Sequence, residues 1–288
     1  MISPSSTFWQ KIWFYFKSNR LAIFSGWLLI VFIMLAITVP FLSSYSYYDV
    51  NLSIKNQPPS PNHWFGTDDL GRDIFVRIWY GARISFFVGI AAACIDLVIG
   101  ALWGGIAALA GGKLDEIMMR FVDILSALPS LLITITLIVA LGSGLHTIII
   151  ALSVLGWFTM ARIVRGQLLK IKQQEYVLAA RALGANFWRI LFRHLFPNAV
   201  GPILVTLTLT IPSAIFTEAF LSYLGLGVQA PIASWGTMAN EGLPAMEYYP
   251  WRLWVPATFI SLTLLAFHII GDGLNDAITQ VTEYRETS

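Results

Sequence analysis

The chain has 288 residues, of which 57% are hydrophobic and only 12% are charged, and its mean hydropathy is +0.70. Soluble proteins carry about 25% charged residues, so this composition indicates an integral membrane protein. The net charge of +2 is too small to suggest a nucleic-acid-binding protein. The single cysteine, Cys94, excludes a disulfide framework and a thiolate metal site.

Six apolar segments each come close to the roughly 20 residues that a helix needs to cross a bilayer. They cover residues 21–42, 84–110, 121–141, 147–164, 199–223 and 253–271. Their apolar runs are continuous rather than alternating, which favours helices over the strands of a membrane barrel. The sequence therefore predicts an all-α integral membrane protein with six transmembrane helices.

The distribution of basic residues predicts the orientation. If the N-terminus lies inside, thirteen of the 18 lysine and arginine residues fall on the cytoplasmic side and five fall outside. The positive-inside rule therefore places both termini in the cytoplasm. The predicted segments are a cytoplasmic N-terminus with the first helix (1–42), a periplasmic loop with an interfacial helix (43–83), a five-helix core (84–278) containing a cytoplasmic loop (165–198), and a cytoplasmic tail (279–288).

The cytoplasmic loop is polar, basic and rich in helix-forming residues. Gly184 predicts a turn between two short helices over 173–183 and 186–196, with Asn186 as a cap and Pro197 as the end of the second. The loop could serve as a docking surface for a partner protein, because small side chains allow another backbone to approach closely. The alternative is a plain amphipathic helix that rests on lipid headgroups.

The chain lacks the motifs of a nucleotide-hydrolysing or metal-dependent enzyme. It contains no GxxxxGK[ST], HExxH or GxSxG pattern, and its four histidines are far apart. We therefore expect no catalytic residue, no metal site and no cofactor bound by this chain.

The cytoplasmic loop resembles the EAA loop of bacterial ABC importer permeases. The resemblance rests on Ala179, Ala180 and Gly184, followed thirteen residues later by Pro197. The family pattern has Glu where this chain has Leu178. In that family the loop is the coupling helix that docks on the ATP-hydrolysing subunit. The resemblance implies an ATPase-coupling role for the following residues: Glu175, Ala179, Ala180, Arg181, Gly184 and Pro197.

Two further segments resemble dipeptide and oligopeptide permease subunits. Residues 65–73, FGTDDLGRD, look like a GTDxxGRD motif, and residues 218–227, EAFLSYLGLG, are similar to ExxLSFLGLG. The periplasmic motif comprises Gly66, Thr67, Asp68, Gly71, Arg72 and Asp73. The resemblance implies the type I ABC importer permease fold and peptide import across the bacterial inner membrane. The family also contains permeases for nickel and for antimicrobial peptides.

The resemblance also implies partners. They are a second homologous permease subunit, two ATP-binding subunits that bind the ATP and Mg, and an extracytoplasmic peptide-binding protein. A secondary transporter driven by an ion gradient is an alternative, with Asp96 and Glu218 as ion or proton carriers. An intramembrane enzyme is disfavoured because the chain shows no nucleophile–base constellation.

Two acids fall inside predicted spans, where an ionised carboxylate costs at least about 2.5 kcal/mol. Glu218, with Ser222 one helical turn later, could line the transport pathway or act as a hydrogen-bonding brace, with Arg83 as a partner. Asp96 could line the pathway or, in its protonated form, bridge two helices.

The acids of the periplasmic motif also have two interpretations. Asp68 or Asp69 could cap a short interfacial helix over 70–80. The alternative is a contact with the binding protein or with the partner permease.

Overall fold

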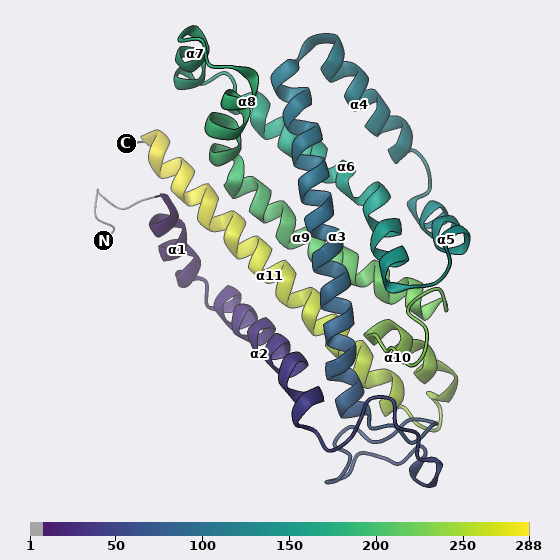
Figure 1. Cartoon of the computed structure of the whole chain (residues 1–288). Helices are drawn as coiled ribbons and strands as arrows, with labels where there is room; N and C mark the ends of the chain where they lie inside the picture. Colours follow the sequence, from purple (N-terminus) through teal and green to yellow (C-terminus); the bar gives the residue numbers. More distant parts are fainter. Residues whose placement is uncertain (1–7, 288) are drawn as a thin grey trace.

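A computed structural model describes residues 8–287 (Figure 1). Residues 1–7 and 288, which belong to the predicted terminal segments, lie outside the described residues. The α-helices are α1 (Phe8–Ser18), α2 (Arg20–Leu42), α3 (Ile74–Ala110), α4 (Gly112–Ser126), α5 (Ser130–Leu141), α6 (Leu145–Ile171), α7 (Glu175–Ala182), α8 (Phe187–Arg189), α9 (Phe196–Tyr223), α10 (Trp235–Gly242) and α11 (Trp251–Thr287). Short 3-10 helices, η1 (Leu52–Ile54) and η3 (Leu243–Ala245), and a π-helix, η2 (Ile190–Leu195), complete the set. The prediction of an all-α fold is confirmed.

Five helices of the described chain are long and apolar enough to cross a membrane: α2, α3, α6, α11 and the continuous segment from α8 to α9. The sixth expected span, over 121–141, is not one helix. It is a pair, α4 and α5, bent by 80° at the intervening residues. Pro129 accounts for the break, because proline disfavours a helical conformation at the preceding residue and lacks an N–H. With 12 residues, α5 is about 18 Å long and is too short to cross about 30 Å of hydrocarbon alone.

Helix α3 has 37 residues and is about 55 Å long, so it extends well beyond the hydrocarbon core. Its N-cap is Asp73, whose carboxylate accepts a hydrogen bond of 2.9 Å from the Val76 amide. The expected cap at Asp68 or Asp69 is therefore wrong. The expected separate helix over 70–80 is wrong as well, because the chain from residue 74 onward is part of the long helix.

Helices α3 and α6 approach each other closely at two glycines. A Cβ atom at Gly104 would lie 2.2 Å from the Ala161 carbonyl oxygen, and one at Gly100 would lie 2.7 Å from that of Trp157. These two glycines, four residues apart in a GxxxG pattern, therefore serve helix packing within the chain, because only glycine lets the two backbones come this near.

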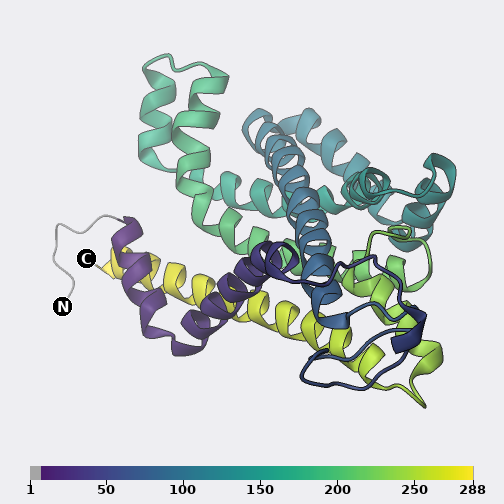
Figure 2. The ribbon, with the colours of Figure 1, turned by 60° about the horizontal axis from the view of Figure 1, so that its bottom comes forward.

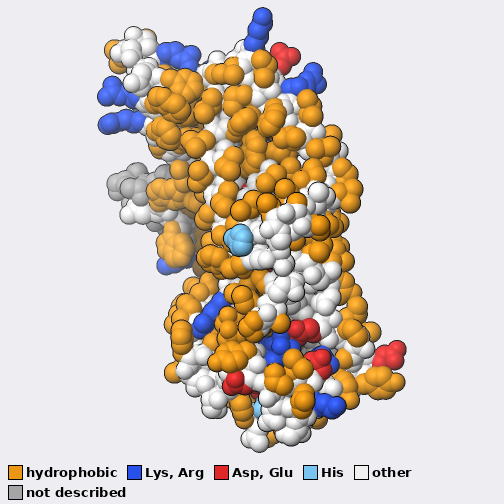
Figure 3. Space-filling model, turned by 45° about the vertical axis from the view of Figure 1, so that its right-hand side comes forward, with side chains coloured by type: hydrophobic (Ala, Val, Ile, Leu, Met, Phe, Trp, Pro, Cys, Tyr) orange, Lys and Arg blue, Asp and Glu red, His pale blue; other side chains and the backbone are white. Residues whose placement is uncertain are grey.

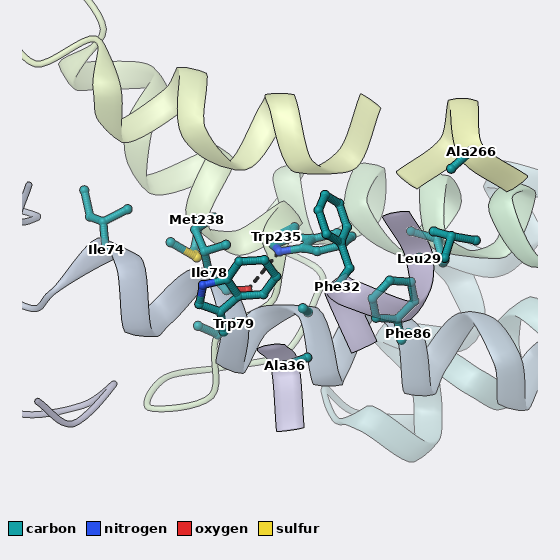
Figure 4. Close-up of a cluster of buried hydrophobic side chains, with 13 residues drawn as sticks. Leu29, Phe32, Ala36, Ile74, Ile78, Trp79, Phe86, Trp235, Met238 and Ala266 are labelled. Atoms are coloured by element: carbon teal, nitrogen blue, oxygen red, sulfur yellow. Dashed lines mark hydrogen bonds between the residues drawn. The ribbon is translucent and has the colours of Figure 1, made fainter. Parts of the chain in front are cut away.

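The bundle has two ends, which are named here by the short helices that they carry. One, here called the α7 end, carries α7, α8 and the junction of α3 with α4; the other, the α10 end, carries α10 and the loop over residues 43–73 (Figure 1). The largest core cluster lies toward the α10 end, where α2, α3, α10 and α11 meet around Trp235 (Figure 4). The Trp235 side chain is fully buried and donates a hydrogen bond of 3.0 Å to the Ile78 carbonyl. This bond is one of several polar contacts between α10 and α3.

Candidate functional site

Helices α7 and α8 form a hairpin that projects from the bundle (Figure 2). Gly184 has φ +82° and makes the turn between them, and the Asn186 side chain accepts a hydrogen bond of 2.8 Å from the Arg189 amide. The predicted turn and cap are therefore confirmed. The predicted end at Pro197 is wrong, because the chain continues through the π-helix η2 into α9. Pro197 lies in the first turn of α9, where a missing N–H costs little.

The hairpin is held to the bundle by one buried side chain and presents small and apolar side chains to the outside. Val177 is fully buried in a cluster with residues of α6 and η2. Leu178 and Leu183 are 50% and 89% exposed. Glu175, Ala179 and Arg181 are exposed, and Ala180 is half-buried. Several exposed apolar side chains gathered on one projecting hairpin, here Leu178, Leu183 and Trp188, are typical of a surface that another molecule covers.

Three basic side chains of this region hold the bundle together rather than facing a partner. Arg165 forms a bidentate ion pair with Asp115 on α4, at 2.5 Å from Nε and 2.7 Å from Nη2. Arg162 pairs with Asp123, also on α4, at 3.2 Å. These contacts fix the amphipathic helix α4 against α6.

The third structural cation is Lys172, which follows α6. Its Nζ donates hydrogen bonds of 2.8 and 3.1 Å to the carbonyls of Ala108 and Leu109, at the C-terminal end of α3. Burial, together with the nearby Arg181, lowers the pKa of Lys172, whereas Asp115 opposes the shift. Lysine is favourable at this place because it satisfies the terminal carbonyls of a helix.

The remaining basic side chains of the hairpin face outward. Arg181, Arg189 and Arg193 are exposed, and none of them forms an ion pair with another described residue. Lys and Arg side chains gather around this end of the molecule, above a broad hydrophobic surface (Figure 3). The α7 end therefore offers both apolar contacts and positive charge.

At the α10 end, the predicted periplasmic motif folds into a buried ion cluster. Asp68 is 3% exposed and pairs with Arg72 at 2.7 Å and with Arg77, both of which are buried as well. Glu241, in α10, accepts from Arg72 at 3.0 Å and from Arg77 at 2.8 Å. Arg252, at the start of α11, pairs with Asp69 at 3.1 Å. The cluster therefore joins the loop to α3, α10 and α11.

The glycines of the motif are required by its backbone. Gly71 has φ +72°, and a Cβ atom there would lie 1.9 Å from the Asn51 carbonyl oxygen. Gly66 has φ +77°, and a Cβ atom there would lie 2.5 Å from the Gln57 carbonyl oxygen. The buried Thr67 hydroxyl donates to the Ile54 carbonyl and accepts from the Gln57 amide at 2.8 Å. These contacts place the residues of the motif in structural roles within the chain.

Glu218 lies fully buried in α9 and is bonded to two serines. Its carboxylate accepts from the Ser222 hydroxyl at 2.7 Å and from the Ser85 hydroxyl, on α3, at 3.0 Å. Arg83 is not its partner; the Arg83 guanidinium donates to backbone carbonyls of α2, including that of Ile37 at 2.7 Å. The brace interpretation is therefore supported, with Ser85 in the place expected for the arginine.

Asp96 differs from Glu218 in having no hydrogen-bonding partner among the described residues. It is 3% exposed, and its Oδ1 atom has no hydrogen bond to any described residue. Its other oxygen lies against the backbone of Gly156 on α6. The carboxyl lines a cavity together with residues of α4, α5, α6 and α9.

Some residues of these sites are not apparent from the sequence. Glu241 and Arg252 lie more than 160 residues from the arginines and the loop that they bind. Ser85 is an ordinary serine in an apolar run, and Gly156 is one of 22 glycines. The only signal in the sequence is that Glu241 and Arg252 both lie in the segment between the last two predicted spans, which the predicted orientation places outside, like the loop over 43–83.

Comparison with known proteins shows which family the chain resembles. Residues 97–283 match the model of the family described as the binding-protein-dependent transport system inner membrane component, and residues 7–59 match the N-terminal TM domain of oligopeptide transport permease C. The chain is 59% identical over 274 residues to the oligopeptide transport system permease protein OppC of Bacillus subtilis, covering 95% of this chain and 90% of that protein. It is 54% identical over 276 residues to the dipeptide transport system permease protein DppC of the same organism, covering 96% and 86%.

A solved structure supports the same fold. The MetNI methionine ABC transporter in an inward facing conformation matches with a TM-score of 0.58 and 20% identity, covering 69% of this chain and 94% of the matched chain. At this identity the likeness shows the fold alone, which is that of a type I ABC importer permease. Together with the match over residues 97–283, it shows that the chain belongs to the family of binding-protein-dependent transport system inner membrane components.

Proposed function

We propose that the chain is the transmembrane permease subunit of an ATP-driven importer that carries dipeptides or oligopeptides across the inner membrane. The observation that carries the proposal is the 59% identity to an oligopeptide permease over 95% of the chain. The resemblance of the segments 65–73 and 218–227 to peptide permeases supports it, and both segments form buried polar clusters toward the α10 end of the bundle. The chain is a membrane subunit without catalytic activity, and the ATPase is a separate subunit.

The complete importer would contain four kinds of component. They are this chain, a second homologous permease, two ATP-binding subunits that hold the ATP and Mg, and an extracytoplasmic peptide-binding protein. The α7 end faces the cytoplasm in this arrangement, and both termini lie on the same side. The basic side chains at the α7 end support this orientation.

The α7 hairpin is the surface that would dock on an ATP-binding subunit. The exposed leucines and the small side chains of Ala179 and Ala180 suit a groove with apolar walls. Leu178 stands where the family pattern has Glu, so docking would depend on apolar contact and on Arg181 rather than on an acid at that position. Glu175, at the start of α7, is the nearest exposed acid.

The docking role is tested by Leu183→Glu. A buried charge at the centre of an apolar interface is costly, so we expect the ATP-binding subunits to copurify at least about 10-fold less with this variant. Leu52→Glu is the matched control, because Leu52 is also an exposed leucine (62%) but lies in the loop at the α10 end. Equal copurification of both variants would show that the hairpin does not dock there.

The transport function is tested with the complete importer in proteoliposomes. We expect uptake of a radiolabelled tripeptide that requires ATP and the binding protein and that is insensitive to an uncoupler. Uptake that survives ATP depletion but collapses with the uncoupler would instead indicate an ion-coupled transporter.

A further inference from the structure

The cavity lined by Asp96 has the size of a ligand site. Its volume is about 640 Å³, and its walls come from α4, α5, α6 and α9, with Asp96 contributed by α3. Ligand pockets in proteins commonly measure about 300–1,000 Å³. The cavity lies within the membrane-spanning part of the bundle, where a carboxyl without a partner requires an explanation.

A bracing role does not explain Asp96. A brace needs a hydrogen-bonding partner on a neighbouring helix, as Glu218 has in Ser85. The Oδ1 atom of Asp96 has no such partner within the described chain, and no described Lys, Arg or His pairs with it. A Cβ atom on Gly156, which lines the same cavity, would lie 2.1 Å from the Asp96 Oδ2 atom. Because Gly156 has no side chain, it leaves room for the Asp96 carboxyl, although the Oδ1 atom of that carboxyl makes no hydrogen bond to the described chain.

A second part of the cavity wall is a stripe of hydroxyl groups on α9. Thr206, Thr210, Ser213 and Thr217 follow one another at helical spacing, and all four line the cavity. Each hydroxyl donates its hydrogen to the backbone carbonyl four residues earlier, at 2.8–3.0 Å. A hydroxyl that donates to its own helix has only oxygen lone pairs left to offer. The stripe therefore presents hydrogen-bond acceptors to the cavity.

The one basic side chain among the described lining residues is paired with an acid outside the cavity through its Nη2 atom. Arg162 donates to Asp123 at 3.2 Å and to the Ser126 hydroxyl at 2.7 Å. The cavity thus combines an acid that has no partner among the described residues, a row of hydrogen-bond acceptors, and, in the described wall, no cation that lacks an acidic partner. Its complement is a ligand that is rich in N–H donors and carries a positive charge.

We propose that Asp96 is a substrate-binding residue that receives the protonated amino terminus of a peptide in transit, while the α9 hydroxyl stripe accepts hydrogen bonds from its N–H groups. This inference rests on the proposed function. It goes further by naming the amino terminus as the end of the peptide that is recognised inside the membrane. A peptide with a free amino terminus supplies both the positive charge and a series of main-chain N–H donors. The site lies in this chain itself and acts after release from the binding protein.

The test measures peptide binding to the complete importer in lipid nanodiscs, without the binding protein. Radiolabelled tri-alanine is compared with N-acetyl-tri-alanine, which keeps the N–H groups but lacks the charge. For the unaltered chain we expect the free amine to bind about 10-fold more tightly or better, as a charge-assisted hydrogen bond contributes. Asp96→Asn should abolish this preference and leave the Kd of the acetylated peptide within about twofold. Glu116→Gln, an exposed acid on α4 outside the cavity, should keep the preference.

A second measurement separates recognition from a structural role. Asp96→Asn removes a buried charge without removing any internal hydrogen bond of its Oδ1 atom, so the Tm of the importer should stay the same or rise. A lower Tm, or loss of the second permease from the complex, would overturn the proposal in favour of a brace or a subunit contact. Equal weakening of both peptides, or an unchanged preference, would overturn it too. If the unaltered importer takes up no peptide at all, the proposed function itself is wrong.

Discussion

Replacing Asp68 with alanine should be among the most destabilising single changes at the α10 end. The Asp68 carboxylate lies between the Arg72 and Arg77 guanidinium groups, which are 5% and 2% exposed. It also accepts from the backbone amides of Leu70 and Arg72, both at 2.9 Å. Without it, two buried cations would depend on Glu241, whose side chain is 34% exposed. Removing one partner from a buried ion pair costs about 3–5 kcal/mol.

The neighbouring residue provides a matched control. The Asp69 side chain is 54% exposed and makes one ion pair, with Arg252 at 3.1 Å, so Asp69→Ala should cost at most about 1 kcal/mol. Thermal unfolding of the purified importer, followed by tryptophan fluorescence, should show a fall in Tm of roughly 6–20 °C for Asp68→Ala and at most about 4 °C for Asp69→Ala. Equal falls for the two variants would refute the assignment of Asp68 as the centre of the cluster.

Three further substitutions test other parts of the structure. Gly71→Ala should prevent normal folding of the loop, because residue 71 has a positive φ and the new Cβ atom would lie 1.9 Å from a backbone oxygen. Gly26→Ala, whose Cβ atom would enter open space, should leave the Tm unchanged or raise it slightly in the same melting experiment. Glu218→Leu should lower stability by about 1–3 kcal/mol by leaving the Ser85 and Ser222 hydroxyls without their acceptor, and Glu218→Gln should cost less. Lys172→Met should accelerate hydrogen exchange in the last turn of α3 without changing exchange at the α10 end.

The sequence allows the helices to be predicted well because the membrane makes long apolar runs unambiguous. Turns and caps set by local chemistry, such as Gly184 and Asn186, are predictable for the same kind of reason. The bent α4–α5 pair is missed because an apolar window ignores the effect of Pro129 on the residues before it. Pro197 shows the opposite error, since a proline in the first turn of a helix does not interrupt it.

The polar clusters are less predictable because their partners come from distant parts of the chain. The motif acids suggest a cap by local rules, yet Asp68 pairs with Arg72 and Arg77, and the second acid of the cluster, Glu241, lies more than 160 residues away. Asp96 and Glu218 look alike in sequence, as single acids in apolar spans. In the structure Ser85 lies beside Glu218, whereas Gly156 lies beside Asp96. Only these neighbours distinguish the bracing acid, Glu218, from the acid without a partner in the described chain, Asp96.

Helix α6 connects the hairpin to the cavity. Leu168, near its C-terminal end, packs in the same core cluster as Val177 of α7, and Gly156, twelve residues earlier, lies against Asp96. At 1.5 Å per residue these two points are about 18 Å apart along one continuous helix. Between them, α6 is fitted to α3 at Gly104 too closely for the two helices to slide independently. We therefore expect a push on α7 to move α6, α3 and the Asp96 carboxyl together. The α5 wall of the cavity also packs on α6, through Ile138, but it is joined to α4 by an 80° bend, so we expect docking at the hairpin to change the shape of the proposed peptide site.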